Sequence, residues 1–326
     1  MRAFEHSAAR SADEAVAALR AGDASIIAGG ADLLSLMKAN IVAPARVIDL
    51  KPARDLRGIS VGQDGSLRIG ALTTLADIER DATLAERFPI LPAAMRDAAT
   101  LQLRNMATVG GNLMQRNRCW YFRGQFNCWL KGGEQCFARG GQNKYHAIFE
   151  DGPCVAVHPS DLAPALLALD ASVVVTGPSG ERTLRLDELL QSPTPERRRD
   201  TTLGADEVIV AVTVPAQPVG ATGAYLKLME RQAWAYALVS AAAQLTLRDG
   251  VVERARVVLG AVANTPRRLR AVEAAIEGQP LTPEIAASAA EQAIEGATPL
   301  AHNAYKLQMA RELTRRAILQ AAGMSW

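Results

Sequence analysis

The sequence predicts an α+β protein of two or three domains, and three observations support this prediction. Short apolar runs alternate with helix-like segments over residues 11–176. A hairpin turn signal lies at Arg248-Asp249-Gly250-Val251, and helical segments close the chain. The 326 residues can bury a large core, and a content of 49% hydrophobic and 21% charged residues is typical of a globular protein.

The first segments predict a small βαβ-like unit with two glycines at its first strand-to-helix turn. Ser11 and Glu14 form a capping-box pattern that starts a helix, which Gly22 ends. The next expected elements are a strand at 25–28, a helix at 31–39 with Leu33, Leu34 and Met37 on one face, and a strand at 46–50.

The central part of the chain predicts a second group of strands and helices. The expected elements are a strand at 67–69, helices at 74–80 and 89–99, a loop rich in backbone donors at 104–113, a helix at 161–169 and a strand at 171–176. Thr73 or Thr74 is the expected cap of the helix at 74–80. Residues 114–157 lack periodicity and contain all the cysteines, which indicates an irregular insertion organised by something other than a hydrophobic core.

The C-terminal part predicts antiparallel strands followed by helices. A linker is expected at 215–223, and strands at 244–247 and 252–258 flank the hairpin turn. The expected helices lie at 267–277, 283–295 and 301–322.

Composition excludes several function classes. The net charge of +2 gives no electrostatic case for nucleic acid or an acidic membrane surface, and the run at 197–199 is expected in a solvated loop. No apolar stretch approaches the ~20 residues of a membrane span. The first residues lack the apolar run of a signal peptide, so we expect a cytoplasmic protein by default. Export together with a partner subunit that carries a signal is the alternative.

The first glycine pair lies in a candidate phosphate-binding loop. Adjacent glycines allow a close approach of the backbone to a ligand, and the helix that follows directs free N–H groups at an anion. The candidate cofactor residues are Ala28, Gly29, Gly30, Ala31, Asp32, Leu33 and Leu34. The spacing is not G-x-G-x-x-G, so a Rossmann dinucleotide site is not supported. A plain structural turn is the alternative interpretation.

A second glycine pair, Gly110 and Gly111, repeats this pattern. The side chains of Thr108 and Asn112 are candidates to bind phosphate or ribityl oxygens. Together the two loops predict a clamp that holds one diphosphate from two sides.

Four cysteines are the whole cysteine content, and they are candidate metal ligands. Cys119, Cys128, Cys136 and Cys154 have the spacing C-x8-C-x7-C-x17-C, which lacks the C-x2-4-C pairs of zinc ribbons. A [4Fe–4S] cluster requires four thiolates and accepts open spacing. Four reduced thiols remain the alternative. His146 and His158 are either neighbours of a cluster or structural histidines.

Three motifs resemble a known family. AGGADLL at 28–34, LRNMATVGGNL at 103–113 and HPSDLAPALLALDA at 158–171 resemble the FAD-binding subunits of the molybdenum hydroxylases, the xanthine dehydrogenase and aldehyde oxidoreductase family. The resemblance covers nearly the whole chain. The cysteine segment is most similar to that of the periplasmic-type aromatic aldehyde oxidoreductases, in which four cysteines hold a [4Fe–4S] cluster. Ala31 stands where many members have threonine.

The resemblance implies a vanillyl-alcohol-oxidase-like FAD fold in two subdomains, residues 1–58 and 59–218, with an iron–sulfur insertion at about 114–157 and an α+β domain at 222–326. FAD is then expected between the subdomains, with Asp161 and Lys227 near the flavin or ribityl chain. The implied function is electron transfer in an aldehyde oxidoreductase that has a molybdopterin-binding large subunit and a [2Fe–2S] small subunit, as a heterotrimer or its dimer. On this interpretation no catalytic residue for aldehyde oxidation lies in this chain.

Two alternatives remain. The first is the beta subunit of a 4-hydroxybenzoyl-CoA reductase, in which electrons run the opposite way. The second, from another class, is a flavin-free metal-binding scaffold or redox sensor.

Overall fold

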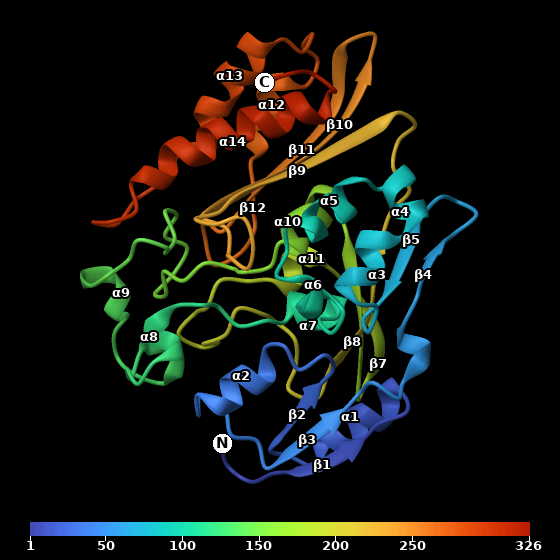
Figure 1. Cartoon of the computed structure of the whole chain (residues 1–326), viewed down its shortest axis with the longest axis vertical. Helices are drawn as coiled ribbons and strands as arrows, with labels where there is room; N and C mark the ends of the chain where they lie inside the picture. Colours follow the sequence, from blue (N-terminus) through green and yellow to red (C-terminus); the bar gives the residue numbers. More distant parts are fainter.

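The computed structural model describes residues 1–326, and the chain begins with a small parallel sheet (Figure 1). Its elements are β1 (Glu5–Ala8), α1 (Ala12–Arg20), β2 (Ala24–Ile27), α2 (Leu33–Lys38) and β3 (Arg46–Asp49). The strand order is β1-β3-β2 and both pairs are parallel, so the predicted βαβ unit is confirmed and β1 is an addition to it. The Ser11 hydroxyl caps α1 as predicted, but the return bond of the predicted capping box is absent, because the Glu14 carboxylate accepts from the Arg10 amide instead. The buried side chains of α2 are Leu36 and Met37, whereas Leu34 is exposed, which corrects the predicted apolar face.

An antiparallel five-stranded sheet forms the centre of the molecule, in the order β4-β5-β8-β6-β7. Its strands are β4 (Ile59–Val61), β5 (Leu67–Gly70), β6 (Ser172–Gly177), β7 (Gly180–Arg185) and β8 (Val208–Val214). The helices around it are η1 (Arg54–Leu56), α3 (Leu75–Arg80), α4 (Ala82–Arg87), α5 (Ile90–Arg96), α10 (Leu162–Ala168) and α11 (Leu186–Leu189). Thr74 caps α3 in a capping box with Asp77, so one of the two expected caps is confirmed.

The segment between α5 and α10 contains only short helices. They are α6 (Leu101–Arg104), α7 (Val109–Leu113), α8 (Trp120–Arg123), η2 (Trp129–Lys131) and α9 (Phe137–Gly140). The prediction of an irregular insertion is therefore confirmed. The expected loop at 104–113 is wrong in one respect, because its glycines lie inside α7.

A four-stranded antiparallel sheet and a layer of helices complete the chain. The strands are β9 (Ala221–Leu228), β10 (Val239–Arg248), β11 (Val251–Gly260) and β12 (Arg267–Arg268), and the helices are α12 (Arg270–Ile276), α13 (Pro283–Ala290), η3 (Glu291–Ile294) and α14 (Tyr305–Ala321). The hairpin and the helical end are as predicted, whereas β9 begins inside the expected linker and β12 inside the expected helix at 267–277. Asp249 and Gly250 have φ of 51° and 79° in the β10–β11 turn, the positive values that a tight hairpin requires.

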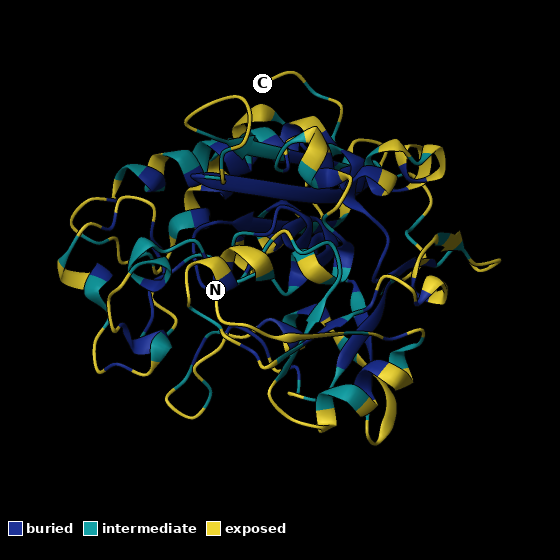
Figure 2. Ribbon diagram, turned by 60° about the horizontal axis from the view of Figure 1, so that its bottom comes forward, coloured by how far each residue is buried: buried dark blue, intermediate teal, exposed yellow.

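Both faces of this last sheet are covered. Helices α12 and α14 pack on one face, and α5 and α10 pack on the other, which joins the C-terminal sheet to the central core. Buried residues accordingly run along β10 from Val239 to Thr246, and Figure 2 shows burial concentrated in the strands and in the inner sides of the helices. No helix has both the length and the apolar character that a bilayer crossing needs.

Candidate flavin and cysteine sites

The first glycine loop provides a row of free backbone donors. It connects β2 to α2, and the amides of residues 29–33 donate to no acceptor within the chain. Gly29 packs so closely on the neighbouring segment that a Cβ atom there would lie 1.7 Å from the Met106 carbonyl oxygen. Glycine is therefore required at this position to keep the two loops together.

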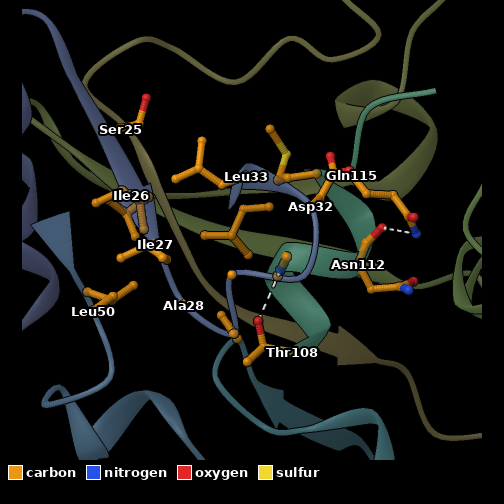
Figure 3. Close-up of a pocket in the computed structure, with 18 of the residues that line it drawn as sticks. Ser25, Ile26, Ile27, Ala28, Asp32, Leu33, Leu50, Thr108, Asn112 and Gln115 are labelled. Atoms are coloured by element: carbon orange, nitrogen blue, oxygen red, sulfur yellow. Dashed lines mark hydrogen bonds between the residues drawn. The ribbon is translucent and has the colours of Figure 1, made fainter. Parts of the chain in front are cut away.

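Both glycine loops line one cavity of about 390 Å³. Its other walls come from β2 and from residues 203–209, which lead into β8. Figure 3 shows Asp32 and Leu33 of the first loop facing Thr108 and Asn112 of the second across this space. The predicted residues of the two loops are thus brought together, apart from Leu34, which does not line the cavity.

The second glycine pair forms part of the cavity wall, but its amides are used within the protein. The Thr108 hydroxyl caps α7 by accepting from the Gly111 amide, and the Gly110 amide donates to the Ala71 carbonyl. Asn112 accepts from the Ser160 hydroxyl through Oδ1 at 2.5 Å, which leaves its amide nitrogen for a ligand. The free donors of the cavity are therefore concentrated in the first loop.

Asp32 ties the first loop to the cysteine segment. Its Oδ1 lies 2.7 Å from Arg118 Nη1 and 2.8 Å from Arg123 Nη2, and its Oδ2 accepts from the Arg116 amide at 2.8 Å. All four groups are largely shielded from solvent. Sequence reasoning identified Asp32 but not these arginine partners, which lie 84 to 91 residues away along the chain.

A second cavity, of about 670 Å³, lies beyond Arg118. Arg118 lines both cavities, and its Nε donates to the Tyr236 hydroxyl at 2.6 Å. The walls of the second cavity come from residues 156–161, from 234–238 and from the first residues of the cysteine segment. Asp161 also lines this cavity.

Asp161 and Lys227 form a buried ion pair at the wall of this cavity. Lys227 Nζ lies 2.8 Å from Asp161 Oδ2, and the Tyr225 hydroxyl donates to Asp161 Oδ1 at 2.8 Å. The Lys227 side chain is 1% exposed, so it is not a surface lysine. Burial raises the pKa of Asp161 in spite of the opposing effect of the Lys227 charge. This arrangement fixes a carboxylate at the cavity wall with both oxygens occupied.

The four cysteines line a third, very small cavity of about 10 Å³. Its other lining residues are aromatic or aliphatic. Cys119 also lines the second cavity. A hydrogen bond from the Cys154 thiol lowers the pKa of Cys136 to about 6, and burial raises the pKa of Cys119 to about 11. No three of the acidic, cysteine or histidine side chains lie close enough to hold a single metal ion.

The two histidines differ in their relation to the cysteines. His146 Nε2 lies 3.1 Å from Cys119 Sγ, whereas His158 lines the second cavity and its Nδ1 accepts from the Ser160 amide at 3.4 Å. Burial lowers the pKa of both imidazoles to about 4, so both are neutral at physiological pH. His146 is thus a neighbour of a candidate ligand, one of the two roles that the sequence left open.

Comparison with known proteins identifies the family. Residues 2–217 match the FAD binding domain in molybdopterin dehydrogenase, and residues 224–321 match the CO dehydrogenase flavoprotein C-terminal domain. The chain belongs to this family of molybdopterin dehydrogenase flavoproteins. FAD binding by the N-terminal part is therefore supported, the predicted fold class is confirmed, and the flavin-free scaffold is not favoured.

The relatives extend over the full length of this flavoprotein. The aldehyde oxidoreductase FAD-binding subunit PaoB of Escherichia coli K12 is 36% identical over 98% of this chain and 99% of the relative. The carbon monoxide dehydrogenase medium chain of Hydrogenophaga pseudoflava is 31% identical over 97% and 96%. Among solved structures, carbon monoxide dehydrogenase from Hydrogenophaga pseudoflava has a TM-score of 0.79 at 29% identity over 99% of this chain and 98% of that chain. Quinoline 2-oxidoreductase from Pseudomonas putida 86 has a TM-score of 0.78 at 28% identity, with the same coverage.

Proposed function

We propose that this chain is the FAD-containing electron-transfer subunit of a molybdenum-dependent aldehyde oxidoreductase, which converts an aldehyde to a carboxylate. The observation that carries this proposal is the full-length match to an aldehyde oxidoreductase FAD-binding subunit, together with the two cavities on either side of Arg118. Relatives named for aldehyde, xanthine and carbon monoxide oxidation do not favour the 4-hydroxybenzoyl-CoA reductase alternative.

The free amides of residues 29–33 suit the diphosphate of FAD. A row of N–H groups at the start of α2 offers hydrogen bonds and a positive partial charge to an anion. Gly110 and Gly111 lie on the opposite wall and leave room for the ligand, since neither has a side chain. The diphosphate then lies between segments 1–58 and 59–218.

The second cavity suits the flavin ring. It adjoins the first at Arg118, and its apolar and aromatic walls, with a few fixed polar groups, have the character of a cofactor pocket. Asp161 lies at its wall, where Lys227 and Tyr225 hold the carboxylate in one orientation. FAD, when bound, supplies the ability to take up two electrons and to release them singly.

The four cysteines suit a [4Fe–4S] cluster as donors. They converge on one cavity, and the buried apolar groups around them form clusters of only 7 and 3 residues, a small core for an insertion of this length. A cubane spreads its iron corners apart, so its ligands need not meet at the distances of a single ion. The cavity is narrow, and the cysteine side chains must therefore rotate outward to hold a cluster.

The partners follow from the same proposal. A molybdopterin-binding large subunit oxidises the aldehyde, and a [2Fe–2S] small subunit delivers electrons to this chain, in a heterotrimer or its dimer. Relatives named as medium chains of carbon monoxide dehydrogenase support such an assembly. Purified alone, the chain is expected to show no aldehyde turnover, and turnover by the isolated polypeptide would contradict the proposal.

The decisive experiment is anaerobic co-purification of the complex with cofactor analysis. We expect one FAD and about four irons with matching acid-labile sulfide on this chain, and molybdenum on a partner. Cys128→Ser should remove the iron and keep the flavin. A complex with flavin but without iron on this chain would refute the cluster alone, whereas a colourless complex would refute the whole proposal.

A further inference from the structure

His146 lies beside one of the cysteines that the proposed cluster uses. It is 3% exposed, and its Nε2 lies 3.1 Å from Cys119 Sγ. Its Nδ1 is buried and has no hydrogen-bond partner. We assign the proton to Nε2, so that the imidazole donates to Cys119 Sγ when this sulfur is a thiolate ligand.

The N-terminal end of α14 holds the backbone of His146 in place. Lys306 Nζ donates to the carbonyl oxygens of His146 at 3.0 Å and Ala261 at 2.6 Å. Asn303 donates to the carbonyls of His146 and Ala147 at 3.2 and 2.8 Å. Both side chains are buried, so the C-terminal domain fixes the position of the imidazole relative to the sulfur.

Lys306 is a buried ammonium group without a carboxylate partner. It is 1% exposed, it forms no salt bridge, and its only acceptors are the two carbonyls. Burial lowers its pKa to about 7, because an unpaired charge in a protein interior is costly. His146 links this group to the cysteines, because Lys306 contacts its carbonyl oxygen and Cys119 Sγ contacts its ring.

We propose that Lys306 and His146 raise the reduction potential of the cluster held by the four cysteines. The inference rests on the proposed cluster. Reduction adds one electron and one negative charge to the cluster, no covalent bond of the cluster forms or breaks, and the added negative charge favours the protonated form of Lys306. A buried positive charge and a hydrogen bond to a sulfur ligand both stabilise the reduced, more negative form.

Lys306 and His146 thus act on the cluster through charge and hydrogen bonding. The quantity to measure is the reduction potential of the cluster. The test is an EPR-monitored redox titration of the anaerobic complex, with iron and sulfide counted in each sample. Lys306→Gln retains a donor and removes the charge, and Lys306→Met removes both. We expect the reduction equilibrium constant of the cluster to fall about tenfold in each, which corresponds to 59 mV for a one-electron couple.

Three further variants distinguish an effect on the reduction potential from an effect on folding. Lys144→Met is the matched control, because Lys144 also lies in the segment next to His146 but is exposed and paired with Glu230; its potential should not change. His146→Leu should lower the potential, and His146→Gln, which keeps a donor, should restore part of it.

The outcomes are distinct. An unchanged potential in Lys306→Gln with full iron content overturns the inference, and so does loss of the cluster in all the Lys306 and His146 variants, because that result shows a structural role only. Absence of iron from the wild-type chain overturns the proposed cluster instead.

Discussion

Gly29→Ala gives the sharpest test of the flavin site. The new methyl group would lie 1.7 Å from the Met106 carbonyl oxygen and 2.5 Å from its carbonyl carbon. These are backbone atoms, so no side chain can rotate away. The two loops must separate by about 1.7 Å to reach an ordinary contact of 3.4 Å.

This separation has a calculable effect on FAD binding. Overpacking of this kind costs about 1–3 kcal/mol of folding stability. The displacement also moves the free amides of the first loop away from the second, and the loss of one hydrogen bond to a charged group costs about 1.5–3 kcal/mol. We therefore expect FAD affinity to fall about 10- to 150-fold.

The assay is titration of flavin-free protein with FAD, followed by fluorescence, and thermal unfolding of each variant. Gly110→Ala should have a smaller effect, since its Cβ would lie 3.2 Å from the Ala71 methyl group. Gly140→Ala is the control, because a Cβ there meets nothing within 4 Å. Wild-type FAD affinity in a folded Gly29→Ala protein would refute the placement of the diphosphate between the loops.

Three further predictions concern charged groups. Asp161→Asn leaves the ammonium of Lys227 buried and uncompensated, so urea unfolding should show a loss of about 3 kcal/mol; an unchanged midpoint would contradict this. Asp32→Asn removes the acceptor shared by two guanidinium groups, so iron content should fall in the purified complex, and full retention would show that the link is not needed. Ion pairing, chiefly with Arg315, lowers the pKa of Glu312 from 4.5 to about 2, so its stabilising effect is present above pH 4.5 and is lost as the pH falls towards 2. The difference in unfolding free energy between wild type and Glu312→Gln should therefore vanish over this range, and a constant difference would argue against the shift.

Elements specified by local sequence were predictable. The N-cap at Thr74 and the Asp249-Gly250 turn are each encoded within a few residues, and both occur in the structure. Strand β8 was not predicted, although its sequence VIVAVTV is a continuous apolar run. Its partners β5 and β6 lie far away in sequence, so its central place in the sheet depends on pairing that no local pattern reveals.

The candidate site was likewise predictable only in those features that local sequence specifies. The glycine loops and cysteines were recognisable by residue type, but the use of each donor was not. Thr108 was expected to bind a ligand, yet its hydroxyl caps the helix that contains the second glycine pair. Lys306 carries no signal in sequence, because an unpaired buried lysine looks like any helix lysine until the fold brings it to the carbonyl of His146.

The three cavities share walls in a way that bears on electron transfer. Arg118 lines the first and second cavities, and the next residue, Cys119, lines the second and third. One peptide bond therefore separates the group that borders the proposed diphosphate and flavin spaces from a proposed cluster ligand. Because Asp32 also pairs with Arg118, the first glycine loop and the segment that carries the sulfurs are held together. If FAD and the cluster occupy these cavities as proposed, no movement of domains is needed to bring the two cofactors close to each other.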